Sequence, residues 1–126
     1  MRVFKVKGVV RFTRRERIAD ATLNAAIERA ERGIIDADLG GGLIKQRLAR
    51  PGQGRSGGYR VIVAYRAEDR AVFLYGFAKN DLDNIGPDQL ETFRMIGANW
   101  LAAAAETIGQ AIADGELQEI DRDDEA

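Results

Sequence analysis

Apolar and polar residues alternate with several different periods along the chain, and each period predicts an element. The apolar run at 3–6 predicts a short first strand. Thr13 and Glu16 fit a capping box that would open a helix, and Asp20 could cap a second one, so one long helix and a helical hairpin both remain open. Gly33 is a plausible terminator. The apolar residues at helical spacing in this region are Leu23, Ile27, Ala30 and Ile34.

The period changes to that of strands after the glycines at 40–42. The segments expected next are a strand at 43–49, a loop at 50–57, a strand at 58–66, a hairpin turn at 67–70 and a strand at 71–79. The last two strands are apolar on both faces, so we expect them at the centre of the sheet.

A single apolar stripe predicts one further helix near the C-terminus, opened by Pro87 and Asp88 and ended by Gly109 or Gly115. The stripe consists of Leu90, Phe93, Gly97, Trp100, Ala104 and Ile108. Residues 117–120 predict a short edge strand. The whole order predicts a single α+β domain over residues 1–120, with helices against one side of a mostly antiparallel sheet, followed by an acidic tail at 121–126.

The missing residue types exclude several kinds of chemistry. The chain has neither Cys nor His, which excludes disulfides, zinc thiolates, Ser-His-Asp triads and the His pairs of many metal-free ribonucleases. No run approaches the roughly 20 apolar residues that span a bilayer. Because no apolar signal region precedes the first strand, we expect a cytoplasmic protein. The carboxylates at 116–125 resemble a metal site only in composition, and no metal or cofactor is expected.

The net charge of −1 conceals a strong polarity along the chain. Residues 1–80 carry 17 Lys and Arg against 8 Asp and Glu, whereas residues 81–126 carry 2 against 12. The first two-thirds is therefore a basic body of the kind that attracts polyanions, and the last third is acidic.

Basic residues are most concentrated on the predicted strands between 39 and 79. Lys45 and Arg47 project from one face of their strand, and Arg60 and Arg66 share a face of the next, because side chains alternate with period two. Strands that pair side by side would gather several of these cations into one patch. A plain solvated face is the alternative reading of the same pattern.

Three further cations belong to this stretch. Arg50 and Arg55 lie in the predicted loop, and Lys79 ends the third strand on the face assigned to Phe73, Tyr75 and Phe77. A patch of this kind can neutralise RNA phosphates and stabilise the charge of a pentavalent phosphate. RNA supplies its own nucleophile in the 2′-OH, so cleavage needs only activation, alignment and protonation of the leaving oxygen.

Several segments together resemble the RelE/ParE toxin superfamily, in particular a RelE-like branch similar to HigB. The segments are DADLGGGLIKQRLARPGQG at 36–54, GGYR at 57–60 and YGFAKN at 75–80, followed by Asn84 and Ile85. The resemblance covers most of the chain, from Val3 through the helix that contains Phe93, and the glycine-rich loop is its most distinctive part.

The resemblance implies a microbial-ribonuclease-like fold and cleavage of messenger RNA in the ribosomal decoding site without metal, which would inhibit translation and arrest growth. The implied partner is a cognate helix-turn-helix antitoxin. Lys45 and Arg47 match the paired basic positions before the loop, Arg60 matches an arginine that contacts the scissile phosphate, and Lys79 is a looser match. By pattern, Arg50, Arg55 and Arg66 would add RNA contacts.

Two other functions fit the same fold. A ParE-like protein would inhibit DNA gyrase and lack a hydrolytic site, although the basic cluster favours the nuclease. A catalytically inactive module that binds RNA or an antitoxin is the third possibility. It stays open because RelE uses a tyrosine shortly after the downstream basic position, and this chain has no tyrosine after Tyr75.

Overall fold

The structure, a computed structural model, describes residues 1–50, 54–79 and 85–122. In chain order these residues form β1 (Arg2–Val6), α1 (Lys7–Glu16), α2 (Asp20–Glu31), β2 (Ala37–Gly40), β3 (Leu43–Arg50), β4 (Gly54–Arg66), β5 (Arg70–Ala78), α3 (Pro87–Ala102), α4 (Ala105–Ala113) and β6 (Leu117–Ile120). Among these elements, no helix combines the length and the apolar character that a membrane crossing needs.

The described strands form one sheet in the order β2-β3-β4-β5-β1-β6. All neighbours are antiparallel except β1 and β5, which run parallel. The first strand lies between β5 and β6. The predicted α+β class, the central position of β4 and β5, and the edge position of β6 are therefore confirmed. The segment at 37–40 forms the other edge strand, β2, which the sequence pattern did not mark, and β4 begins at Gly54 inside the expected loop.

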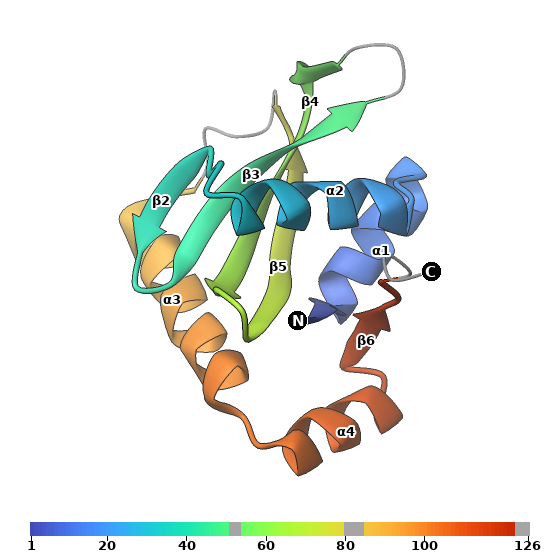
Figure 1. Ribbon diagram of the computed structural model, residues 1–126, viewed down its shortest axis with the longest axis vertical. Coiled ribbons are helices and arrows are strands. Elements are labelled where there is room, and N and C mark those ends of the chain that lie inside the picture. Colours follow the sequence, from blue (N-terminus) through green and yellow to red (C-terminus); the bar gives the residue numbers. More distant parts are fainter. Residues whose placement is uncertain (51–53, 80–84, 123–126) are drawn as a thin grey trace.

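Helices cover both faces of the sheet rather than one, so the expected one-sided arrangement is wrong (Figure 1). One core lies between the sheet and the two N-terminal helices, and its largest fully buried side chains include Phe73, Leu23, Ile27 and Leu48. The other core lies between the opposite face and α3 and α4, around Phe4, Leu43, Ile62 and Ile108. A sheet that is apolar on both faces needs a helical layer on each of them.

The first N-terminal helix starts at a different residue from the one that the capping pattern indicated. α1 begins at Lys7, six residues before Thr13, and Thr13 is buried with its hydroxyl donating to the Val10 carbonyl at 3.1 Å. The Lys7 amide is satisfied by the Glu116 carbonyl at 3.1 Å, so tertiary contact replaces a side-chain cap. A second helix does begin at Asp20, which settles the open choice in favour of two helices.

The C-terminal apolar stripe forms two helices instead of the single helix expected. The chain turns extended at Ala103 and Ala104. Nη1 of Arg70 donates to the carbonyls of Trp100 and Ala103 at 2.8 and 2.9 Å, which satisfies the end of α3. The break redirects α4 so that Ile108 becomes fully buried in the second core.

Candidate nucleic-acid interface

The pairing of β3 with β4 brings the predicted cations together. Arg47 lies directly opposite Arg60, and Lys45 lies opposite Ile62. Directly opposed side chains share a face, with Cβ atoms about 4.5–5.5 Å apart. Arg60 is in turn opposite Phe77 of β5. We call the set of Lys45, Arg47 and Arg60 the basic face; it lies on the α3 side of the sheet, because Ile62 belongs to the second core.

The two guanidinium groups of the basic face influence each other electrostatically. Burial lowers the pKa of Arg60, the positive charge of Arg47 lowers it further, and Asp36 opposes both effects in part. The Arg60 guanidinium also donates to the Tyr59 carbonyl at 3.2 Å, which helps to hold it in place. Like charges placed directly opposite each other are unfavourable unless an anion joins them. The arrangement therefore suits a phosphate group.

Asp36 lies beneath the basic face and orients Arg47. Its Oδ2 accepts hydrogen bonds from Nη2 of Arg29 at 2.9 Å and from the Arg47 amide at 2.7 Å. The same Arg29 nitrogen donates to the Arg47 carbonyl at 3.0 Å. Burial tends to raise the pKa of Asp36, but these hydrogen bonds and the two arginine charges outweigh it and hold the pKa below its usual value. The carboxylate therefore stays ionised and holds the Arg47 amide, while Arg29, paired with it, holds the Arg47 carbonyl.

Gln46, between the two cations of β3, anchors the strand to the N-terminal helices. It is fully buried. Its Oε1 accepts from the Asp36 amide at 2.7 Å, and its Nε2 donates to the carbonyls of Ala26 and Ile34 at 3.0 and 3.2 Å. These bonds tie α2 and the segment before β2 to β3. The strand that carries the basic face is therefore anchored from the opposite side of the sheet.

Aromatic rings flank the basic face on the α3 side. Tyr75 lies 5.7 Å from Phe77 and 5.3 Å from Phe93 between ring centroids. The expected grouping of Phe73 with Tyr75 and Phe77 is wrong, because the register between β4 and β5 shifts at a bulge between Ile62 and Val63 and Phe73 packs in the other core. Tyr75 is 37% exposed, the most open of these rings, and offers a surface beside the cations.

The other predicted site residues are distributed unevenly. Lys79 is exposed and directly follows β5, two residues after the partner of Arg60, so it lies at the same end of the sheet. Arg66 shares the face but lies six residues further along β4, about 20 Å away, where it bonds Asp69 and the Leu101 carbonyl. The side chains of Arg50 and Arg55 lie outside the described part of the chain, so their predicted RNA contacts stay predictions.

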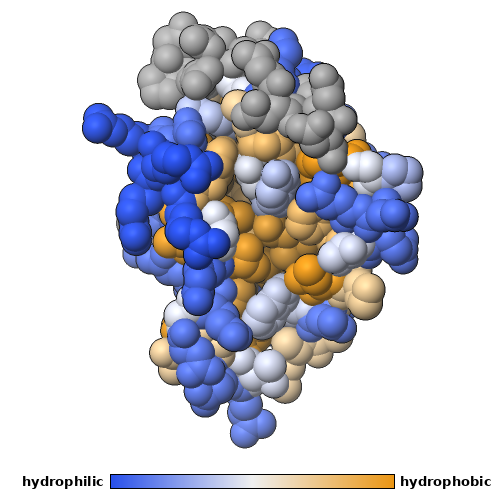
Figure 2. Space-filling model, turned by 180° about the vertical axis from the view of Figure 1, so that it is seen from behind, coloured by the Kyte–Doolittle hydropathy of each residue, from blue (hydrophilic) through white to orange (hydrophobic). Residues whose placement is uncertain are grey.

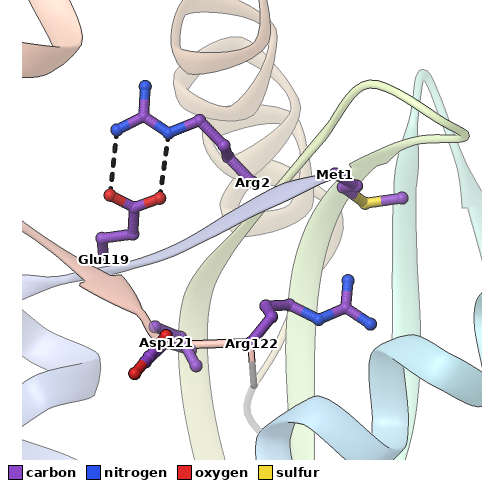
Figure 3. Close-up of a pocket in the computed structure, with 6 residues that line it drawn as sticks. Met1, Arg2, Glu119, Asp121 and Arg122 are labelled. Atoms are coloured by element: carbon purple, nitrogen blue, oxygen red, sulfur yellow. Dashed lines mark hydrogen bonds and ion pairs between the residues drawn. The ribbon is translucent and has the colours of Figure 1, made fainter. Parts of the chain in front are cut away.

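A separate polar pocket of about 450 Å³ lies where the start of β1 meets the end of β6. In Figure 3 the Arg2 and Glu119 side chains face each other across it, joined by two hydrogen bonds of 2.9 Å. Arg122 points away from that pair, toward Glu31 of α2, which accepts from it at 3.1 Å. Both arginines are therefore paired with carboxylates here. Within the described ranges, no cluster of three acidic side chains could hold a metal ion.

Asp36, Arg29 and Gln46 were not among the residues predicted for the site. Gln46 did carry a signal, since it occupies the apolar phase of its strand between Ile44 and Leu48, where a polar residue needs buried partners. Arg29 carried none, because only the packing of α2 on β3 brings it to Asp36.

The fold and the basic face define a small α+β protein that presents clustered cations from neighbouring strands, a surface suited to phosphate groups. The family model described as the RelE toxin of the RelE / RelB toxin-antitoxin system matches residues 1–120. The chain therefore belongs to the RelE toxin family and is a toxin of a toxin–antitoxin system. No curated protein matches the chain.

Proposed function

We propose that this toxin is a ribosome-dependent endoribonuclease that cleaves messenger RNA without a metal and so inhibits translation. The observation that carries the proposal is the direct pairing of Arg47 with Arg60 on one face, with Lys45 two residues away on the same strand. Membership of the RelE family supports the same reading. A gyrase inhibitor would need a protein-binding surface but no pair of opposed guanidiniums.

The proposed chemistry divides the roles by proton affinity. The 2′-OH attacks the adjacent phosphorus, its proton passes to a base, and the 5′-oxygen leaves after accepting a proton from an acid. Arg47 and Arg60 hold the non-bridging oxygens, since guanidinium stays protonated and matches phosphate geometry. Lys45 acts as base or electrostatic activator, and Lys79 as acid or stabiliser of the transition state. Arg50, Arg55 and Arg66 would add contacts along the RNA.

The test uses purified ribosomes that translate a defined message, with cleavage mapped by primer extension. Arg60→Ala should lower the cleavage rate by about 10²–10³, the usual effect of removing one donor to a developing negative charge. Arg32→Ala is the control, because Arg32 is exposed at the end of α2, away from the basic face. Unchanged cleavage by folded Arg60→Ala would refute the assignment, and gyrase inhibition without cleavage would favour the ParE-like alternative.

The partner that we propose is a helix-turn-helix antitoxin encoded beside this chain, and the site of action is the cytoplasm. The toxin of a toxin–antitoxin system must be neutralised by its cognate antitoxin, and the family match names the RelE / RelB type of pair. Expression of the chain alone should arrest growth, and co-expression with the neighbouring gene should relieve the arrest. Growth arrest that Arg60→Ala also causes would argue for a target other than RNA.

A further inference from the structure

The exposed side of α1 carries a row of cations that the basic face does not include. Val9, Phe12 and Thr13 are the buried residues of this helix. The side turned to solvent carries no large apolar residue that is exposed. Its exposed cations, which we call the α1 ridge, are Lys7, Arg11, Arg14, Arg15 and Arg17.

Most of the α1 ridge is not neutralised by nearby carboxylates. Glu16, the only acidic residue of α1, accepts a hydrogen bond from the Tyr59 hydroxyl at 2.9 Å and one from Arg15 at 3.3 Å. The Arg15 guanidinium also lies 5.7 Å from the Phe12 ring centre. In the described part of the chain, Arg11 and Arg14 form no ion pair. Their charges are therefore available to a partner.

The C-terminal end of the ridge lies at the same end of the sheet as the basic face, but on the opposite face of the sheet. Lys7, Arg11 and Arg14 stand at helical spacing, so the Cβ atoms of neighbouring members are about 5–6 Å apart along the helix. The helix ends beside Tyr59, the residue that precedes Arg60 in β4. Seen from behind, Figure 2 shows a broad strip of hydrophilic residues along the side of the molecule where α1 lies. A folded RNA large enough to reach around this end of the sheet could contact both surfaces.

We propose that the α1 ridge is a second RNA-binding surface, which docks on the phosphate backbone of folded RNA and so positions the toxin for cleavage. The inference rests on the proposed function for its biological setting. Backbone binding is electrostatic and needs no apolar anchor. Protein interfaces are built around a desolvated core of aromatic and apolar side chains, and the ridge offers cations without an exposed apolar side chain among them. Its chemistry therefore fits RNA better than an acidic protein.

The experiment measures binding of a double-stranded RNA hairpin to the full chain at several salt concentrations. Arg11→Gln should weaken binding severalfold at low salt and lower the slope of log K against log salt by about one, and Arg11→Gln/Arg14→Gln should lower it by about two. Arg32→Gln, an exposed cation on the other N-terminal helix, is the matched control and should leave the slope unchanged. Equal slopes for Arg11→Gln and Arg32→Gln overturn the proposal.

Cleavage on ribosomes, measured for the same variants, separates this inference from the proposed function. Arg11→Gln should require more ribosomes for half-maximal cleavage while the rate at saturation stays within about twofold of wild type. If wild type does not cleave at all but the hairpin slopes fall as expected, the nuclease proposal fails and the RNA-binding ridge stands. If Arg11→Gln keeps its RNA slope but no longer binds the antitoxin, the ridge is a protein interface and the inference is wrong.

Discussion

Asp36 is the residue whose removal most directly tests how the basic face is held. Its carboxylate accepts one hydrogen bond from Arg29 and one from the Arg47 amide, and the Arg29 and Asp36 side chains are only 12% and 17% exposed. A hydrogen bond to a charged group contributes about 1.5–3 kcal/mol, and water can replace part of two such bonds at this depth. Asp36→Ala should therefore lower the free energy of unfolding by about 2–4 kcal/mol.

Urea denaturation followed by the fluorescence of Trp100, the only tryptophan, measures this loss. Asp38→Ala is the matched control, because Asp38 is exposed and accepts from the Gly40 amide, and its loss should cost under about 1 kcal/mol. A double-mutant cycle with Arg29→Ala should give a coupling energy of about 1–3 kcal/mol. Equal costs for Asp36→Ala and Asp38→Ala, or no coupling with Arg29, would refute the reasoning.

The pH dependence of the same difference gives a further check on Asp36. Its pKa in the folded protein is held below the value of an unfolded carboxyl, near 4. The stabilisation should therefore be fully present above about pH 5 and lost as the pH falls through the folded pKa. The gap in stability between wild type and Asp36→Ala should narrow below pH 4. A gap that is constant from pH 7 to pH 3 would show that the charge of Asp36 does not contribute.

Three other substitutions test packing and buried polarity, each by its effect on the unfolding midpoint. Gly76→Ala would place a Cβ 2.5 Å from two ring carbons of Phe12, so we expect a loss of about 1–3 kcal/mol; an unchanged midpoint would contradict this packing. Gly109→Ala lies in α4 with no atom within 4 Å of the added Cβ and should stabilise by about 0.5–1 kcal/mol; a lowered midpoint would contradict this. Gln46→Leu removes three hydrogen bonds and leaves the Asp36 amide without its acceptor, which should cost about 2–4 kcal/mol; a cost below 1 kcal/mol would mean that water replaces them.

The meeting of Arg47 with Arg60 was predictable because it depends on local geometry. Alternation along each strand assigns the faces, and a hairpin-like meander places neighbouring strands side by side. The prediction failed for Phe73 at the point where this regularity fails. A bulge adds one residue to β5, and every side chain beyond it changes face, which no alternation pattern can anticipate.

The helix boundaries and the Asp36 network were not predictable for a different reason: their determinants are distant in sequence. α1 begins at Lys7 because the carbonyl of Glu116 accepts its amide, and α3 ends where Arg70 bonds its last carbonyls. The capping pattern at Thr13 does not set the start of α1, because burying the apolar face of the helix stabilises it by more than one side-chain cap would.

The balance of charge under the basic face fits the proposal that an ordered surface there binds phosphate. Two opposed guanidiniums alone would repel each other, and a carboxylate on the Arg47 guanidinium would neutralise its charge. Here one carboxylate, Asp36, binds the backbone of Arg47 and pairs its charge with Arg29 from below. The backbone of Arg47 is thus held in place while the guanidinium is not used for this anchoring. The pKa of Arg60 is lowered by burial and by the positive charge of Arg47. A bound phosphate would offset the repulsion between the two guanidiniums, and this would favour its binding.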